Sequence, residues 1–175
     1  YDGPSRDEVL ALRRDYLTPG LLTFYKEPLL VAEGHMQYVW DETGKQYLDA
    51  FAGIVTVSVG HCHPGVVEKV TAQLGKLQHT TTIYLHPTIG QYGKKMAEHM
   101  PAGSGLTSNY FTNSGSEANE IAILMSREHT GNSEVISLRN AYHGGTQAAI
   151  ALTAHGTWKV KTSPTTGVKN ATPGY

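Results

Sequence analysis

The stretch of this chain best suited to chemistry is residues 113–120, with the sequence NSGSEANE. A β-like run precedes it and a helical pattern follows it. A glycine-containing turn that opens a helix leaves several backbone N–H groups unpaired, and the helix dipole adds partial positive charge there. Ser114 and Ser116 add hydroxyl donors, and Gly115 lets the backbone approach an anion closely. The turn therefore suits a phosphate group.

A simpler interpretation of the same turn is helix capping. Ser114 or Ser116 can cap the helix, and Asn119 or Glu120 can complete a local hydrogen-bond network. The turn is neither a Walker loop nor a dinucleotide fingerprint, because the GxxxxGK[ST] and GxGxxG spacings are absent. On the residues of the turn alone, both interpretations stay open.

A second stretch of the same character is residues 139–146, with the sequence RNAYHGGT, after a strand candidate at 134–138. Ligands of parallel α/β sheets bind at the carboxyl ends of strands, where Tyr142 and His143 are expected. The phosphate turn and this aromatic side chain can hold the phosphate and the ring of one cofactor. The alternative is that Tyr142 packs under the following helix, and that the two glycines only relieve crowding.

These two stretches and the run Gly60-His61-Cys62-His63-Pro64 carry a family resemblance. The chain resembles the N-terminal part of class III aminotransferases, which are pyridoxal-phosphate enzymes of fold type I. Within the class, the run at 53–64 is most similar to the mitochondrial-type alanine–glyoxylate aminotransferases. The resemblance runs from about Ser5 to about Trp158 and weakens beyond it.

The resemblance implies an α/β fold in which an N-terminal helix-and-hairpin region leads into a mainly parallel sheet. We expect a domain boundary near residue 60. Residues 1–60 are then the N-terminal region, and residues 61–175 are the beginning of the large PLP-binding domain, which is incomplete here. The chain starts with Tyr1 and is shorter than enzymes of the class, and we interpret it as a fragment.

The family resemblance also implies roles for the residues of both stretches. The cofactor is pyridoxal 5'-phosphate. Gly115 and Ser116, with Ser114 behind them, are expected to anchor its phosphate. Tyr142 is expected to stack on the pyridine ring, a contact that contributes about 0.5–1.5 kcal/mol beyond area burial. His143 is expected to flank that ring.

The substrate pocket is expected to be lined by Ile54 and by the stretch Thr82–Tyr84. Ornithine-type members of the class carry Tyr where this chain has Ile54, and Arg where it has Gly145. An ω-amino acid with a distant charged amine loses those partners, so a small apolar pocket for L-alanine and glyoxylate is favoured. Arg139 is a candidate for binding the substrate carboxylate, although a structural role fits it equally well.

No catalytic residue is expected within this chain. The Lys that forms a Schiff base with the cofactor, and a carboxylate opposite the pyridine nitrogen, are expected beyond residue 175. No Lys of this chain stands in a matching context; Lys69, Lys76, Lys94 and Lys95 are expected on solvated helix faces. We expect the isolated chain to be inactive and prone to aggregation. The alternatives are another class III activity, such as a transaminase for ω-amino acids of the 4-aminobutyrate type, and an inactive truncated product.

Composition is typical of a soluble globular protein, with 17% charged and 39% hydrophobic residues and a net charge of −1. No basic cluster indicates a nucleic-acid partner, and no apolar run approaches the length of a membrane span. The expected partners are an amino acid, a 2-oxo acid and, by resemblance, further copies of the chain in a homodimer or higher oligomer. The resemblance implies a mitochondrial location, with peroxisomal and cytoplasmic alternatives, and no targeting segment is visible.

The single cysteine, Cys62, excludes an internal disulfide. It lies between two histidines, but adjacent side chains cannot easily all reach one ion, so we expect no metal site. The family resemblance makes Gly60–Pro64 a structural turn whose His side chains bond to backbone groups. Neither Cys62 nor Ser116 has the sequence context of a catalytic nucleophile.

The expected elements follow capping, proline and periodicity signals. They are a helix from a capping box at Ser5–Glu8 to about Tyr16, a hairpin of strands 36–40 and 46–50, a winding stretch 51–60, helices from Pro64 to about Leu77 and from Pro87, βα pairs at 109–129 and 134–152, and a loop over 153–175. Two apolar stripes are expected to be buried: Val66, Val67, Val70, Leu74 and Leu77, and Ile89, Tyr92, Met96 and Met100.

Overall fold

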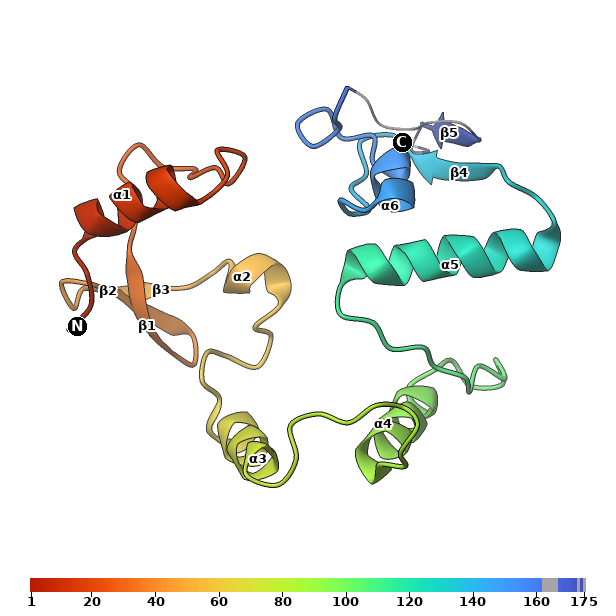
Figure 1. Cartoon of the computed structure of the whole chain (residues 1–175), viewed down its shortest axis with the longest axis horizontal. Coiled ribbons are helices and arrows are strands. Elements are labelled where there is room, and N and C mark those ends of the chain that lie inside the picture. Colours follow the sequence, from red (N-terminus) through yellow and green to blue (C-terminus); the bar gives the residue numbers. More distant parts are fainter. Residues whose placement is uncertain (162–166, 173, 175) are drawn as a thin grey trace. The chain divides into compact units, whose positions relative to one another are not determined.

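The computed structural model describes residues 1–161, 167–172 and 174. The chain divides into two compact units, Tyr1–Leu85 and His86–Tyr175, and each unit is described by itself (Figure 1). The domain boundary expected near residue 60 concerns the complete fold and stays a prediction.

The first unit contains three helices and one antiparallel sheet. Its elements are α1 (Arg6–Tyr16), β1 (Val31–His35), β2 (Tyr38–Asp41), β3 (Gln46–Leu48), α2 (Ala52–Val55) and α3 (Pro64–Leu74). The capping box predicted for α1 is confirmed. Ser5 N donates to Glu8 Oε2 at 2.8 Å, and Glu8 N donates to Ser5 Oγ at 3.3 Å.

The sheet of this unit has the order β1-β2-β3. The predicted hairpin is confirmed as β2 and β3, with Gly44 at φ 84° in its turn. Asp41 holds the turn, because its Oδ1 accepts from the N–H groups of Thr43 and Lys45 and its Oδ2 accepts from the hydroxyl of Tyr47. Strand β1 was not predicted; only pairing with β2 makes it a strand, since it carries few strongly β-forming residues.

Helices α3 and α4 (Pro87–Glu98) begin at their prolines, as predicted. Helix α3 ends at Leu74, where Gly75 follows. The prediction of a buried stripe on α3 is wrong for this structure. The residues of that stripe are 44% to 53% exposed, because no described element covers that face. The stripe on α4 is partly exposed, and Tyr92 stacks on Phe111 at 5.1 Å between ring centroids.

The second unit contains the remaining elements, which are α4, α5 (Gly115–Thr130), β4 (Val135–Leu138), α6 (Gln147–Leu152) and β5 (Val168–Ala171). Strands β4 and β5 are parallel, in keeping with the predicted α/β class. Its buried residues lie on and around α6, with one residue each from α5 and β4; they are Ile123, Ser137, Gly144, Ala149, Ala151, Leu152 and Thr153. Helices α5 and α6 and the two strands are drawn in Figure 1.

Two predicted segments of this unit are wrong. Residues 109–112 form no strand, because no described strand pairs with them; the Asn109 side chain instead donates to the carbonyl of Gly93 at 3.0 Å. The loop predicted for 153–175 contains β5, which pairs in register with β4. Residues 162–166, 173 and 175 of that prediction lie outside the described residues.

Within the described part of the chain, no helix is both long and apolar enough to cross a membrane. The same residues contain no group of three or more His, Cys, Asp or Glu side chains that could hold a metal ion.

Candidate cofactor and substrate site

Ser114 caps helix α5. Its backbone is extended, and its Oγ accepts a hydrogen bond from Glu117 N at 3.2 Å. The Glu117 carboxylate folds back to accept from Asn113 N at 2.8 Å. The capping interpretation is therefore correct for Ser114, whose hydroxyl oxygen is occupied by the helix.

The first two N–H groups of α5 remain available. Gly115 N and Ser116 N have no acceptor among the residues that the structure describes. The Ser116 hydroxyl oxygen accepts from Gly145 N at 3.1 Å, which leaves its hydrogen free to donate elsewhere. These three donors lie at the N-terminus of a 16-residue helix, where an anion is stabilised by the helix dipole.

The two stretches singled out in the sequence lie against each other. Asn119 Nδ2 of α5 donates to the carbonyl of His143 at 2.6 Å. Gly144 has φ 125°, and a Cβ atom added to it would lie 2.9 Å from the Cα of Ser116. Only glycine fits at this position, because both its conformation and the close approach of Ser116 exclude a side chain.

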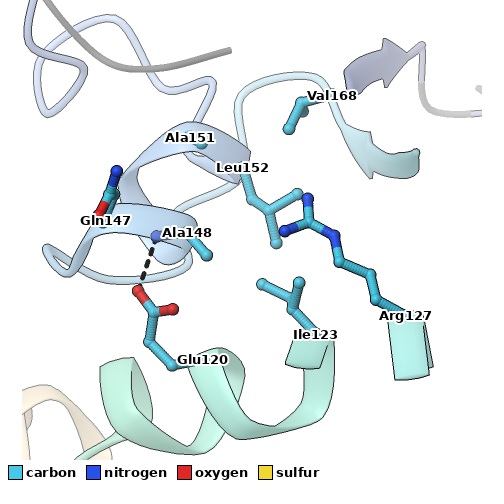
Figure 2. A pocket seen from close by; sticks show the side chains of 8 residues that line it. All are labelled: Glu120, Ile123, Arg127, Gln147, Ala148, Ala151, Leu152 and Val168. Carbon is cyan, nitrogen blue, oxygen red and sulfur yellow. Dashed lines mark hydrogen bonds between the residues drawn. The ribbon is translucent and has the colours of Figure 1, made fainter. Parts of the chain in front are cut away.

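Glu120 joins α5 to the beginning of α6. Its Oε1 accepts from Ala148 N at 2.6 Å and from Ala149 N at 3.4 Å, and so caps α6 from a different helix (Figure 2). Burial alone would raise the pKa of Glu120, but hydrogen bonds from Thr146, Ala148 and Ala149 outweigh it and hold that pKa below its ordinary value of 4.5. Glu120 is therefore ionised at neutral pH and fixes the first turn of α6 to α5.

Tyr142 and His143 follow β4, as predicted. The Tyr142 side chain is 59% exposed and meets the Trp158 ring edge-on, at 6.1 Å between centroids. It does not pack under a helix, as the alternative interpretation required. His143 N donates to Thr153 Oγ1 at 3.0 Å, while its ring Nε2 is buried and has no partner within the described residues. Most buried polar atoms have a hydrogen-bond partner, so His143 Nε2 is a candidate for contact with a bound group.

Asn119, Glu120 and Trp158 were not predicted to shape this site. The sequence interpretation placed Asn119 and Glu120 in a local network, but they reach groups 24 and 28 residues away. The helical spacing could have indicated their role, because Asn119 and Glu120 lie three and four positions after Ser116 and so share its helix face.

The predicted substrate residues belong to the first unit. Ile54 lies in α2 and is 72% exposed. Thr82 and Tyr84 lie in a turn, in which Tyr84 N donates to the carbonyl of Thr81 at 3.1 Å, and the Tyr84 side chain is exposed.

Segment α2 is a left-handed turn. Ala52, Gly53, Ile54 and Val55 have φ values of 52°, 59°, 60° and 57°. Left-handed helical geometry costs about 1–2 kcal/mol for each residue with a Cβ atom, and β-branched residues rarely adopt it. The Thr56 hydroxyl closes the turn by donating to the carbonyl of Gly53 at 2.7 Å.

The prediction that the His side chains of Gly60–Pro64 bond to backbone groups is wrong for His61, and His63 Nδ1 has no partner among the described residues. His61 Nε2 lies 2.6 Å from Asp49 Oδ2. A nearby carboxylate is the stronger partner for an imidazole N–H than a neutral carbonyl. The pKa of Asp49 lies below its ordinary value, chiefly because of this bond and secondly because of the N–H groups of Ala52 and Phe51.

A pocket of about 390 Å³ lies between α5, α6 and β5 (Figure 2). Its lining residues are Glu120, Ile123, Arg127, Gln147, Ala148, Ala151, Leu152 and Val168. None of the predicted cofactor residues is among them. Its charged groups already have partners, since Glu120 caps α6 and Arg127 Nε donates to the carbonyl of Ser133 at 3.0 Å. We therefore do not take this pocket as the functional site.

Residues 24–172 match the model of one protein family, the class III aminotransferases. The chain belongs to this family. Its relatives include alanine–glyoxylate aminotransferase 2 homolog 2, mitochondrial, of Arabidopsis thaliana, which is 44% identical over 91% of this chain and 33% of its own length. They also include human alanine–glyoxylate aminotransferase 2, mitochondrial, at 43% identity over 95% of this chain and 32% of its own length.

Among solved structures, an (S)-enantioselective omega-transaminase from Thermomicrobium roseum matches with a TM-score of 0.85 and 28% identity, over 99% of this chain and 41% of that one. The chain therefore spans about a third of the length of the curated relatives it matches. The match supports the fold-type-I architecture expected from the sequence.

The family implies pyridoxal phosphate as cofactor, and the residues present fit this group. The available N–H groups of Gly115 and Ser116 suit a phosphate, and glycine at 144 keeps the space beside Ser116 free of a side chain. The exposed Tyr142 ring offers a face to an aromatic ring, and the unpaired His143 Nε2 lies in the same loop.

Proposed function

We propose that the complete protein is a pyridoxal-phosphate-dependent aminotransferase that moves the amino group of L-alanine to glyoxylate. The observation that carries the proposal is the packing of the Ser114–Ser116 turn against the loop 142–146, which joins phosphate donors to an exposed aromatic ring. Membership of the class III family supports the reaction type, and the names of the two relatives support the substrates.

In this proposal the N–H groups of Gly115 and Ser116 and the hydroxyl of Ser116 hold the phosphate. Ser114 keeps the helix end in place behind them. Tyr142 covers one face of the pyridine ring and His143 flanks it. When bound, the cofactor supplies an electron sink for the carbanion that forms when an amino acid loses its Cα proton.

The specificity for small substrates comes from Ile54, together with the stretch Thr82–Tyr84. An aliphatic wall in place of a phenol offers no hydrogen bond to a distant ammonium group, and so disfavours ω-amino acids. The group that binds the substrate carboxylate is Arg139 or a residue beyond this chain.

The remaining parts of the proposal follow the family. The Lys that binds the cofactor, and the carboxylate opposite the pyridine nitrogen, lie beyond residue 175. The complete protein is a homodimer or a higher oligomer. It is located in mitochondria, a proposal that the names of the two mitochondrial relatives support.

The test is the visible absorption of the purified full-length protein. We expect a yellow protein whose absorption band disappears when L-alanine is added and returns when glyoxylate is added. A protein that stays colourless in the presence of added pyridoxal phosphate would contradict the proposal.

A second candidate is an ω-transaminase activity on the same cofactor. The structural similarity to the Thermomicrobium enzyme favours it. The same spectral measurement with 4-aminobutyrate and β-alanine separates the two, because an ω-transaminase responds to these donors more strongly than to L-alanine.

A further inference from the structure

The segment 49–61 is a loop whose two ends are joined. Asp49 N donates to the carbonyl of Gln37 at 2.9 Å. At the other end, His61 and Met36 exchange two backbone hydrogen bonds of 2.7 and 2.8 Å. Both ends are thus attached to the turn between β1 and β2, and the Asp49–His61 contact at 2.6 Å ties them to each other.

Asp49 also holds the start of the left-handed turn. Its Oδ1 accepts from Phe51 N and from Ala52 N, each at 3.0 Å, while its Oδ2 binds His61. One carboxylate therefore joins the entry of α2 to the far end of the loop. Both side chains of the pair are largely buried, with 16% of Asp49 and 26% of His61 exposed.

A cavity of about 300 Å³ borders the Asp49–His61 pair, and among the residues lining that cavity Asp49 and His61 are the titratable ones. Gly34 brings β1 against the His61 ring, since a Cβ atom there would lie 2.9 Å from the ring's Cγ. The His61 ring therefore packs directly against the backbone of Gly34.

Strained backbone of this kind persists only where its surroundings impose it, and it is concentrated at functional sites. Ala52, Ile54 and Val55 would each prefer a right-handed or extended conformation. Within the segment, the carboxylate of Asp49 and the hydroxyl of Thr56 are the side-chain groups that hold the turn.

We propose that Asp49 and His61 are positioning residues, which hold the left-handed turn Ala52–Val55 and thereby fix the Ile54 side chain as the wall that limits the size of the amino donor. The part of this proposal that concerns donor size rests on the proposed function. The part that concerns the turn stands on the geometry alone.

The experiment uses the full-length protein with Asp49→Ala and His61→Phe. Phenylalanine keeps the bulk of the ring and removes its N–H, so it tests the contact even if Asp49→Ala fails to fold. Asp49→Asn is the conservative variant, because it keeps an acceptor for the backbone donors. The matched control is Asp41→Ala, which removes a comparable set of hydrogen bonds from the hairpin of the same sheet.

The first measurement is hydrogen exchange at the amides of Val55, Thr56 and Val57, which donate across the turn to Phe51 and Ala52. We expect exchange at least about tenfold faster in Asp49→Ala and His61→Phe, since loss of one such contact is worth roughly a factor of ten in local opening. Asp49→Asn should lie near the wild type, and Asp41→Ala should lower the melting temperature without selective change at these amides. Unchanged exchange in both Asp49→Ala and His61→Phe would overturn the proposal.

The second measurement is kcat/KM for L-alanine and for the larger L-2-aminobutyrate. In Asp49→Ala and His61→Phe we expect the preference for L-alanine over L-2-aminobutyrate to fall by roughly tenfold, through a change in KM rather than in kcat. Faster exchange with an unchanged preference would overturn the specificity role. If the wild type aminates no 2-oxo acid from any donor, the proposed function fails. The exchange data then still decide whether Asp49 and His61 hold the turn Ala52–Val55.

Discussion

The two segments predicted to build the site are held in place in different ways. The turn before α5 uses an ordinary helix cap, with Ser114 in an extended conformation and its hydroxyl on Glu117 N. The turn α2 runs through consecutive left-handed residues, and Asp49 and His61 join its flanking chain. A cap is made by side chains a few residues away, whereas a strained turn depends on contacts across a longer loop. The first can be read from a short sequence motif, and the second cannot.

The substitution with the largest expected effect is Gly144→Ala, at the contact between the Ser114–Ser116 turn and the loop 142–146. A methyl group there meets the backbone of Ser116 at 2.9 Å, and φ 125° disfavours any side chain. We expect a loss of about 3 kcal/mol in stability and a loss of pyridoxal phosphate binding. Urea unfolding and cofactor titration of the full-length protein measure both effects.

Gly145→Ala is the control for this substitution, because nothing lies within 4 Å of its added methyl group and its φ is not positive. It should change stability by less than about 0.5 kcal/mol. Equal effects at both glycines would mean that the contact between Gly144 and Ser116 does not determine the structure of the proposed cofactor site.

The serine pair separates capping from phosphate binding. Ser114→Ala removes the cap of α5 and should cost about 1 kcal/mol of stability. Ser116→Ala removes a phosphate donor and the acceptor of Gly145 N, and should weaken cofactor binding by roughly tenfold. Both variants are measured by thermal unfolding without cofactor and by cofactor titration. If Ser114→Ala weakens cofactor binding more than Ser116→Ala does, the division of roles is wrong.

Glu120→Ala tests the long-range cap of α6. Its loss leaves Ala148 N and Ala149 N without their acceptor and should cost about 1 kcal/mol. Because the folded pKa of Glu120 lies below 4.5, its stabilising effect is fully present above pH 4.5 and is lost as the pH falls below that value. The pH test uses Glu120→Gln, which carries no charge at any pH. The difference in free energy of unfolding between wild type and Glu120→Gln should therefore shrink from neutral pH to strongly acidic pH. A gap that widens on acidification would contradict this assignment.

Ile54→Gly has the smallest expected effect, and its sign opposes that of the others. Glycine relieves the left-handed strain, and the exposed side chain loses little burial, so stability should rise by about 0.5 kcal/mol. The matched control is Ile136→Gly on β4, where a similarly exposed β-branched residue lies in a strand and its loss should destabilise. Denaturant unfolding measures both, and a fall in stability for Ile54→Gly would show that the turn is not strained.

Much of the local structure could be predicted from short motifs. The capping box of α1, the prolines that begin α3 and α4, the hairpin turn with Gly44 and the helix after Gly115 each depend on neighbouring residues. The predictions that failed depend on distant partners. Residues 109–112 lack a strand to pair with, and β5 exists because β4 lies beside it, although Val168–Ala171 has little β character of its own.

The sequence by itself determined the family, the α/β class and the identity of the two stretches proposed to hold a cofactor, because motif residues and their order are local information. Only the tertiary structure decided that Asn119 reaches the loop 142–146, that Glu120 caps α6, that Gly144 must leave room for Ser116, and that Asp49 binds His61. These contacts join residues 12 to 28 positions apart. Such pairings depend on which segments the whole fold brings together, and no spacing rule along one helix or strand specifies them.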